Sequence, residues 1–322
     1  MTQLDPISAD WLALREHADD RARGATMTTL LPALVRSLTD ASAVGDGHGR
    51  DSGTATARPP VLCVDLGTGT GANPRWLMPR LPVEQAWLLV DHDAGLLAEL
   101  GDRLAGTTVP WEPVVSDVAH LRGVLAAHRR PGQAVLVTCA ALLDLLDRAT
   151  VDDLAAILRE ARAHGLFSLS VDGGGGITPV DPLDEAIQSA FNAHQQRHGH
   201  LGPDGVQALR AAVGAGNGTV TVQQTAWRLD SADPDDRALI ERLLRDRADA
   251  VRDQVDRTAA ERSGTVPLPA DSGLADSGLA GSDVDDWLAR RLAATRSGAL
   301  RVRVGHQDVL VTPAGRAGGA AR

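Results

Sequence analysis

Short apolar runs alternate with stretches of helical spacing between residues 60 and 172. Runs rich in valine, leucine and isoleucine predict strands that are buried on both faces of a parallel sheet. Five such strands are expected, at residues 60–66, 86–91, 111–115, 134–138 and 166–171. The segments between them carry apolar residues three and four positions apart, which is typical of helices packed on a sheet. The pattern predicts an α/β fold.

The flanking segments show other patterns. Residues 7–39 have helical spacing and predict two helices, or one that breaks near Gly24, with Ser8 or Asp10 as the N-cap. These helices either pack on the sheet as a layer or fold over a ligand, with Arg15 near its carboxylate. Alternating apolar residues over 219–229 and 300–311 predict two further strands. A long charged helix is expected over 233–262, and another over 284–295.

Several segments have no apolar period. We predict a flexible linker at 40–59, a low-complexity insertion at 263–282 that contains a direct repeat, and a disordered tail at 313–322. The four consecutive glycines after Asp172 predict a loop. The helical segment 177–202 is longer than a simple connection needs, and we interpret it as an insertion beside a substrate. The domain boundaries are therefore a helical cap at 1–39, the linker, and a main domain at 60–312.

A glycine-rich segment follows the first predicted strand and reads Asp65-Leu66-Gly67-Thr68-Gly69-Thr70-Gly71. Glycine permits a sharp turn and lets a ligand approach the main chain. Because Pro74 is tolerated only in the first turn of a helix, the segment joins a strand to a helix N-terminus, which is a nucleotide-binding arrangement. The dinucleotide pattern G-x-G-x-x-G/A also fits, with Ala72 at its end. Asp91 lies about 20 residues after Gly71, where such folds hold ribose hydroxyls.

Composition excludes several classes of function. The formal charge is −10 and the chain contains no lysine, so binding to a phosphate backbone or an anionic lipid surface is not expected. Two cysteines do not indicate a disulfide framework, and we predict no metal site, although His194 and His198 would share a helix face. The first residues lack a secretion signal, and no apolar run has membrane-spanning length. A cytoplasmic protein is expected.

The Asp-Leu-Gly-Thr-Gly-Thr-Gly segment resembles motif I of the S-adenosylmethionine-dependent methyltransferases with a Rossmann-like fold. The resemblance implies a doubly wound, mostly parallel seven-stranded sheet with an antiparallel last strand, N-terminal helices and helical insertions. It implies S-adenosylmethionine as the cofactor, with Asp65 near its ammonium group and Asp91 on its ribose. The residues that would contact this cofactor are Asp65, Gly67, Thr68, Gly69, Gly71, Asp91, His92, Ser116, Asp117, Val118 and Thr138. Asp117 is equally well suited to cap a helix.

The resemblance also implies methyl transfer, and the chain lacks the Asn-Pro-Pro-Tyr-like motif of many enzymes that methylate nitrogen. We therefore expect a small-molecule acceptor, with Asp172 and His194 as candidate catalytic residues because either could orient an acceptor or take its proton. Cys139 lacks a histidine nearby in sequence that would activate it as a nucleophile. Two alternatives stay open: a nicotinamide-dependent oxidoreductase, although the usual Tyr and Lys are missing, and a non-catalytic module that binds S-adenosylmethionine. The oligomeric state is left open.

Overall fold

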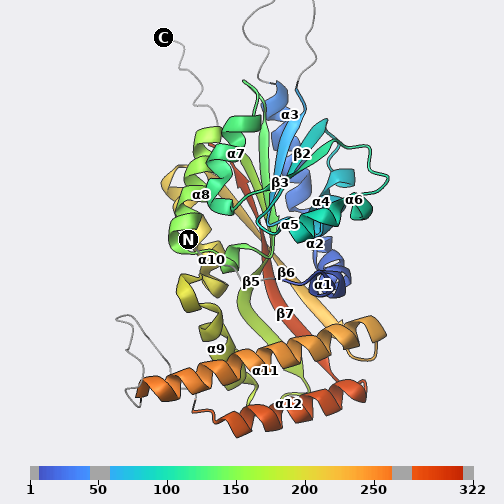
Figure 1. The fold of residues 1–322 in the computed structure, drawn as a ribbon, viewed down its shortest axis with the longest axis vertical. Coiled ribbons are helices and arrows are strands. Elements are labelled where there is room, and N and C mark those ends of the chain that lie inside the picture. The colour runs from blue at the N-terminus through green and yellow to red at the C-terminus, as the bar shows by residue number, and fades with distance from the viewer. Residues whose placement is uncertain (1–6, 44–58, 263–277, 315–322) are drawn as a thin grey trace, which may run out of the picture.

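The computed structural model describes residues 7–43, 59–262 and 278–314 (Figure 1). Within these residues, seven strands form one sheet in the order β3-β2-β1-β4-β5-β7-β6. Strands β1 to β5 run parallel to one another, and β7 is antiparallel to both β5 and β6. The doubly wound fold with an antiparallel last strand is confirmed. The strands are β1 (Val61–Leu66), β2 (Gln85–Asp91), β3 (Trp111–Val115), β4 (Val135–Ala140), β5 (His164–Thr178), β6 (Thr219–Asp230) and β7 (Arg301–Thr312).

Helices cover both faces of the parallel half of the sheet. One face packs against α3, α4, α5 and α6 around Trp76 and Trp87, and the other packs against α7, α8 and α10 around Phe167. Each face takes alternate residues of the central strands, which explains why these strands are apolar throughout. These helices are α3 (Leu30–Ala43), α4 (Ala72–Leu77), α5 (Ala94–Ala98), α6 (Leu100–Arg103), α7 (Leu121–His128), α8 (Arg148–Ala161) and α10 (Gly205–Ala215).

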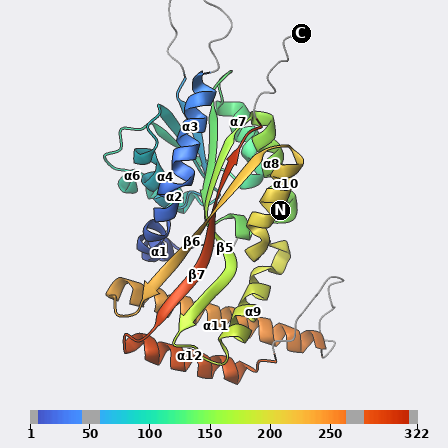
Figure 2. The ribbon, with the colours of Figure 1, turned by 180° about the vertical axis from the view of Figure 1, so that it is seen from behind.

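Strands β5, β6 and β7 continue beyond the ends of the other four strands and carry a second lobe (Figures 1 and 2). Their distal halves form a separate apolar core around Trp227 and Trp287 with the remaining long helices. Those helices are α1 (Ala9–Ala22), α9 (Asp184–Gln195), α11 (Pro234–Arg262) and α12 (Gly281–Arg296). The cleft described below lies where the two lobes meet, because the carboxyl ends of β1, β2 and β4 point toward the second lobe.

The four glycines after Asp172 belong to strand β5, so the predicted loop is wrong. Gly175 and Gly176 pair with Val304 and Arg303 of β7. A Cβ atom on Gly175 would lie 2.9 Å from the carbonyl oxygen of Arg303, so glycine is needed here for close approach of the two strands. The segment that follows is helix α9, which packs against α11 and the distal part of β5.

The N-terminal segment forms three helices, where two were expected. Ser8 caps α1 by accepting a hydrogen bond from the Trp11 amide, and α2 (Gly24–Thr28) separates α1 from α3. Helix α3 continues to Ala43, so residues 40–43 are helical and not part of a linker. The rest of the predicted linker, most of the 263–282 insertion and most of the predicted tail lie outside the described residues. None of the helices that the structure describes has the length and apolar character needed to cross a membrane.

Candidate functional site

The glycine-rich turn connects β1 to α4. Gly67, Gly69 and Gly71 have φ values of +59°, +54° and +83°, which other residues rarely adopt. At Gly71 there is a second constraint, because a Cβ atom would lie 2.8 Å from Cδ2 of Leu100. The turn therefore depends on glycine for both its backbone conformation and its packing.

Replacing Gly71 with alanine is expected to lower the free energy of unfolding by about 1–3 kcal/mol, the cost of a strained left-handed residue. Gly101 provides the matched control, because it lies in helix α6 and a Cβ atom there would meet nothing within 4 Å. Gly101→Ala should leave stability unchanged or raise it, since alanine favours a helix. Urea denaturation measures both values, and equal losses would contradict the strain at Gly71.

Asp91 at the end of β2 holds the turn in place. Its Oδ2 accepts a hydrogen bond from the Gly69 amide at 2.8 Å, and its Oδ1 accepts one from the Asp93 amide at 3.0 Å. The carboxylate is buried but borders the cleft, with the exposed His92 beside it. Because each carboxylate oxygen has two lone pairs, Asp91 retains free acceptor positions toward the cleft.

Asp65 lies beneath the turn and does not line the cleft. Its Oδ1 accepts hydrogen bonds from Asn73 and from the Thr138 hydroxyl, which is 2.6 Å away. Burial raises the pKa of Asp65 to about 6, and the hydrogen bonds and the Arg23 guanidinium oppose this rise. Oδ2 of Asp65 and the Thr68 hydroxyl make no close hydrogen bond with other described residues, and Thr68 lies near enough to Asp65 to help lower its pKa. Thr138 is fully buried, so it contacts Asp65 and not the cleft.

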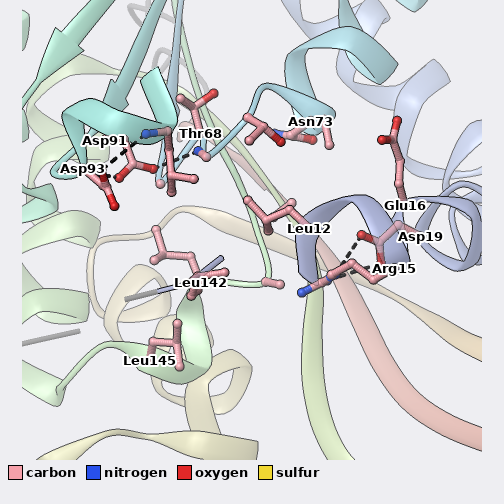
Figure 3. Close-up of a pocket in the computed structure, with 18 of the residues that line it drawn as sticks. Leu12, Arg15, Glu16, Asp19, Thr68, Asn73, Asp91, Asp93, Leu142 and Leu145 are labelled. Atoms are coloured by element: carbon pink, nitrogen blue, oxygen red, sulfur yellow. Dashed lines mark hydrogen bonds and ion pairs between the residues drawn. The ribbon is translucent and has the colours of Figure 1, made fainter. Parts of the chain in front are cut away.

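The cleft lies between the glycine-rich turn and helix α1 (Figure 3). It is open to solvent and is lined by the glycine-rich turn, by α1 and by the residues that follow β4. Leu12 projects from α1 so closely that a Cβ atom on Gly69 would lie 2.9 Å from its Cδ1. Leu142 and Leu145, from the segment after β4, form the opposite wall (Figure 3). An apolar boundary thus faces the polar edge of the sheet.

A second compartment continues the cleft past Gly67, Asp91, His92 and Leu142, which border both parts. Of the residues predicted for the cofactor, Ser116, Asp117 and Val118 line this compartment. Asp117 caps the short helix η3 (Val118–His120) by accepting from the Ala119 amide at 2.8 Å, which confirms its predicted capping role. A role toward the adenine ring stays a prediction. The compartment is completed by Leu146, Leu154 and Ile157, so it combines polar edges with apolar walls.

Arg23 is a buried cation that forms no ion pair with the residues that the structure describes. It lies between α1 and α2 and lines the cleft, yet only 3% of its surface is exposed. Its guanidinium stacks over Trp76, with 4.9 Å between its Cζ and the ring centroid, and makes no hydrogen bond or ion pair with any described residue. Burial lowers the pKa of Arg23, while nearby carboxylates, led by Asp19, oppose this effect. Arginine remains charged, so the site favours an anionic ligand group.

Acidic groups otherwise dominate the cleft. Arg15 is neutralised by Asp19, whose carboxylate is 3.0 Å from its Nε, and Glu16 pairs with Arg75. Helix α1 packs on β6 and also lines the cleft, so its position agrees with both interpretations of the N-terminal helices, and Arg15 already has a partner. The carboxylates along the cleft are those of Glu16, Asp19, Asp20, Asp91 and Asp93. The cleft therefore suits a ligand that carries positive charge together with one anionic group.

The end of β4 and the residues that follow it form one wall of the cleft. Ala140 and Ala141 line the cleft, whereas Cys139 is buried below it, and burial raises the pKa of the Cys139 thiol well above its usual range. A thiol of that kind is a poor nucleophile. Asp144, in the short helix η4 (Leu143–Leu145), is also buried, and burial raises its pKa to about 6.

The structure does not bring the two predicted catalytic residues into the cleft. Asp172 lies on β5 in the second lobe and accepts a hydrogen bond from the Gly174 amide at 2.8 Å. His194 lies on α9 and faces Asp253 of α11, with 3.4 Å between Nε2 and Oδ2. Neither residue lines either compartment of the cleft. Their catalytic roles stay predictions.

Comparisons with known proteins add only a likeness of fold. No family model matches the chain, and no curated protein matches its sequence. Solved structures that resemble it include a cyclopropane-fatty-acyl-phospholipid synthase-like protein from Lactobacillus casei, with 12% identity, a TM-score of 0.42, and coverage of 96% of this chain and 95% of that one. A cyclopropane synthase from Mycobacterium tuberculosis has 11% identity, a TM-score of 0.38 and 79% coverage of both chains.

A third is an S-adenosylmethionine-dependent methyltransferase from Geobacter sulfurreducens in complex with S-adenosyl-L-homocysteine. It has 14% identity, a TM-score of 0.35, and coverage of 86% of this chain and 90% of that one. Values this low carry no argument about activity, so the assignment of fold rests on the strand order and direction. The chain has the seven-stranded fold of the S-adenosylmethionine-dependent methyltransferases, in the order β3-β2-β1-β4-β5-β7-β6.

Proposed function

We propose that the protein binds S-adenosylmethionine and transfers its methyl group to a small-molecule acceptor. The observation that carries this proposal is the buried, unpaired guanidinium of Arg23 in an otherwise acidic cleft. S-adenosylmethionine combines a sulfonium and an ammonium group with a single carboxylate. Its charge pattern therefore matches a cleft that has several carboxylates and one free arginine.

The residues along the cleft fit the parts of this molecule in order. The free acceptor positions of Asp91 suit the ribose hydroxyls, as predicted from its place after the glycines. The second compartment, with apolar walls from Val118, Leu142 and Leu146, suits the adenine ring.

The bound cofactor supplies an electrophilic methyl group, and the protein's part is to orient both reactants and exclude water. Ala140 and Ala141 give the wall of the cleft small, uncharged side chains, which would leave room for an acceptor without competing for the methyl group. A base is needed only for a hydroxyl or thiol acceptor. The proposal therefore assigns no catalytic proton transfer.

A nicotinamide-dependent oxidoreductase is the less favoured alternative. A dinucleotide places an anionic pyrophosphate at the glycine-rich turn. Here that turn faces α1, where Asp20 forms no ion pair with a described residue and would repel a pyrophosphate. A non-catalytic module that binds S-adenosylmethionine would share the same cleft, so only a measurement of turnover separates it from an enzyme.

Calorimetry tests the proposal directly. We expect the protein to bind S-adenosylmethionine and S-adenosylhomocysteine and to show no heat with NAD at the same concentration. Incubation of a metabolite extract with methyl-labelled S-adenosylmethionine should then transfer label to a small molecule. Binding of NAD without binding of S-adenosylhomocysteine would overturn the proposal, and binding without any transfer of label would favour the non-catalytic module.

A further inference from the structure

Strand β5 contains a bulge at the point where it leaves β4. Phe167 pairs with Val309 and Ser170 pairs with Gln307, so Ser168 and Leu169 together face the single residue Asp308 of β7. Leu169 has a φ of +58°, which is unfavourable for a leucine. Its amide donates a hydrogen bond of 2.7 Å to Oδ1 of Asp308. Asp308 therefore holds the bulge in a conformation that the chain does not favour by itself.

The bulge in turn fixes the wall of the cleft. Ser168 pairs with Ala140 at the end of β4, and its carbonyl oxygen accepts a hydrogen bond of 2.8 Å from the Ala141 amide. Ala141 is itself strained, with a φ of +53°, and lines the cleft with Ala140. Two strained residues thus meet at Ser168, one in the cleft wall and one held by Asp308. Strain of this kind concentrates at functional sites.

The second oxygen of Asp308 contacts α2, the short helix that begins beside Arg23. Oδ2 accepts a hydrogen bond of 2.6 Å from the hydroxyl of Thr26 in α2. Thr26 follows Arg23 by three residues, so this bond anchors the short helix that begins beside the unpaired guanidinium. Asp308 is fully buried and forms no ion pair with any residue that the structure describes, and its negative charge helps to keep Arg23 protonated.

We infer that Asp308 is a positioning residue, which fixes Arg23 and the Ala140–Ala141 wall relative to each other so that the cleft is preformed. The inference rests on the proposed function, because the ligand that the preformed cleft would bind is the methyl donor with its carboxylate group. A preformed site loses less entropy when a ligand binds. Loosening one side of the cleft should therefore weaken binding even though no contact with the ligand is removed.

Two buried threonines provide a matched test, because the hydroxyl of each donates a hydrogen bond to the Asp308 carboxylate. Thr26 donates to Oδ2 from α2, the helix that begins beside Arg23, whereas Thr225 donates to Oδ1 from β6 at 3.1 Å, and neither threonine lines the cleft. Thr26→Val and Thr225→Val remove the same kind of bond from the same carboxylate. A purely structural role for Asp308 predicts similar losses of melting temperature and no difference in binding between the two variants.

We expect T26V to weaken the binding of S-adenosylhomocysteine about tenfold, a difference that calorimetry resolves readily, and T225V to change it by less than about twofold. Thr26→Ser, which keeps the hydroxyl, should restore the affinity of the wild type. If T26V does not fold, Thr26→Cys keeps a similar volume with only a weak donor and takes its place. If T26V and T225V bind S-adenosylhomocysteine with equal affinity, the positioning role of Asp308 is wrong, and the proposed function is unaffected. A wild-type protein that does not bind S-adenosylhomocysteine overturns the proposed function and the inference with it.

Discussion

Arg23→Met should weaken the binding of S-adenosylhomocysteine by about 1.5–3 kcal/mol, or roughly 10- to 150-fold in Kd, the range for losing a hydrogen bond to a charged group. The reason is the isolation of the Arg23 guanidinium, which is 3% exposed, borders the cleft and has no ion pair among the described residues. Methionine keeps much of the side-chain volume against Trp76 and removes only the charge and the donors. Calorimetry gives the change in Kd.

Arg80 is the matched control, because its Cζ lies 4.7 Å from the centroid of the same Trp76 ring. It also donates a hydrogen bond of 2.6 Å to the Trp76 carbonyl oxygen, but it does not line the cleft. Arg80→Met should therefore lower the melting temperature and leave the Kd of S-adenosylhomocysteine within about twofold, since no ligand contact is lost. If both variants bind equally well, the carboxylate is held elsewhere and the role of Arg23 is wrong.

The sequence predicted the nucleotide-binding half of the fold because its signals are local. The strand that ends at Leu66, the glycines that follow it and Asp91 all lie close together in the chain, and each has a physical reason for its residue type. The structure places Asp91 against the Gly69 amide, so the spacing of the two residues corresponds to a direct contact. The apolar runs were sufficient to predict the central strands, because helices cover both faces of the sheet and nearly every position of these strands is therefore buried.

The second lobe could not be predicted in the same way, because its contacts join distant parts of the chain. The glycines after Asp172 have low strand propensity, and only their pairing with β7, more than a hundred residues later, makes them a strand. Arg23 had no local signal either. It lies at a break between two helices in an arginine-rich segment, and its burial results from packing on Trp76 beside the glycine-rich turn. His194 was assigned to the cleft from its chemistry, but α9 directs it toward Asp253.

Asp65→Asn should raise the free energy of unfolding at pH 8 and leave it nearly unchanged at pH 4. Burial raises the pKa of Asp65 from 3.8 to about 6, which corresponds to about 3 kcal/mol in favour of the neutral form in the folded state. The contribution to stability is therefore fully present below pH 3.8 and is lost as the pH rises through 6. Asparagine keeps the oxygen that accepts from Asn73 and Thr138, and its amide can face the Thr68 hydroxyl.

Urea denaturation at several pH values tests this predicted pH dependence of the free energy of unfolding. The difference between D65N and the wild type should grow from pH 4 to pH 6 and then stay constant, and a difference that does not change with pH would contradict the raised pKa. Asp144→Asn should show the same trend, because burial also raises the pKa of Asp144 to about 6.

Two buried histidines change the stability of the wild type in the opposite direction, since burial lowers the pKa values of His164 and His306 to about 4. Their stabilisation is lost as the pH falls from 6.5 toward 4, so the wild type alone should show only a weak dependence on pH.

The same substitution also separates stability from function. At neutral pH the folded protein keeps a carboxylate at Asp65 that opposes folding, and a buried charge of this kind is common where a site must bind a ligand. If Asp65 attracts the ammonium group of the methyl donor, D65N should be more stable at pH 8 and yet bind S-adenosylhomocysteine more weakly. An increase in stability with unchanged affinity would show that Asp65 only organises Asn73 and Thr138 beneath the turn. The donor would then depend mainly on Arg23 and Asp91, which both line the cleft.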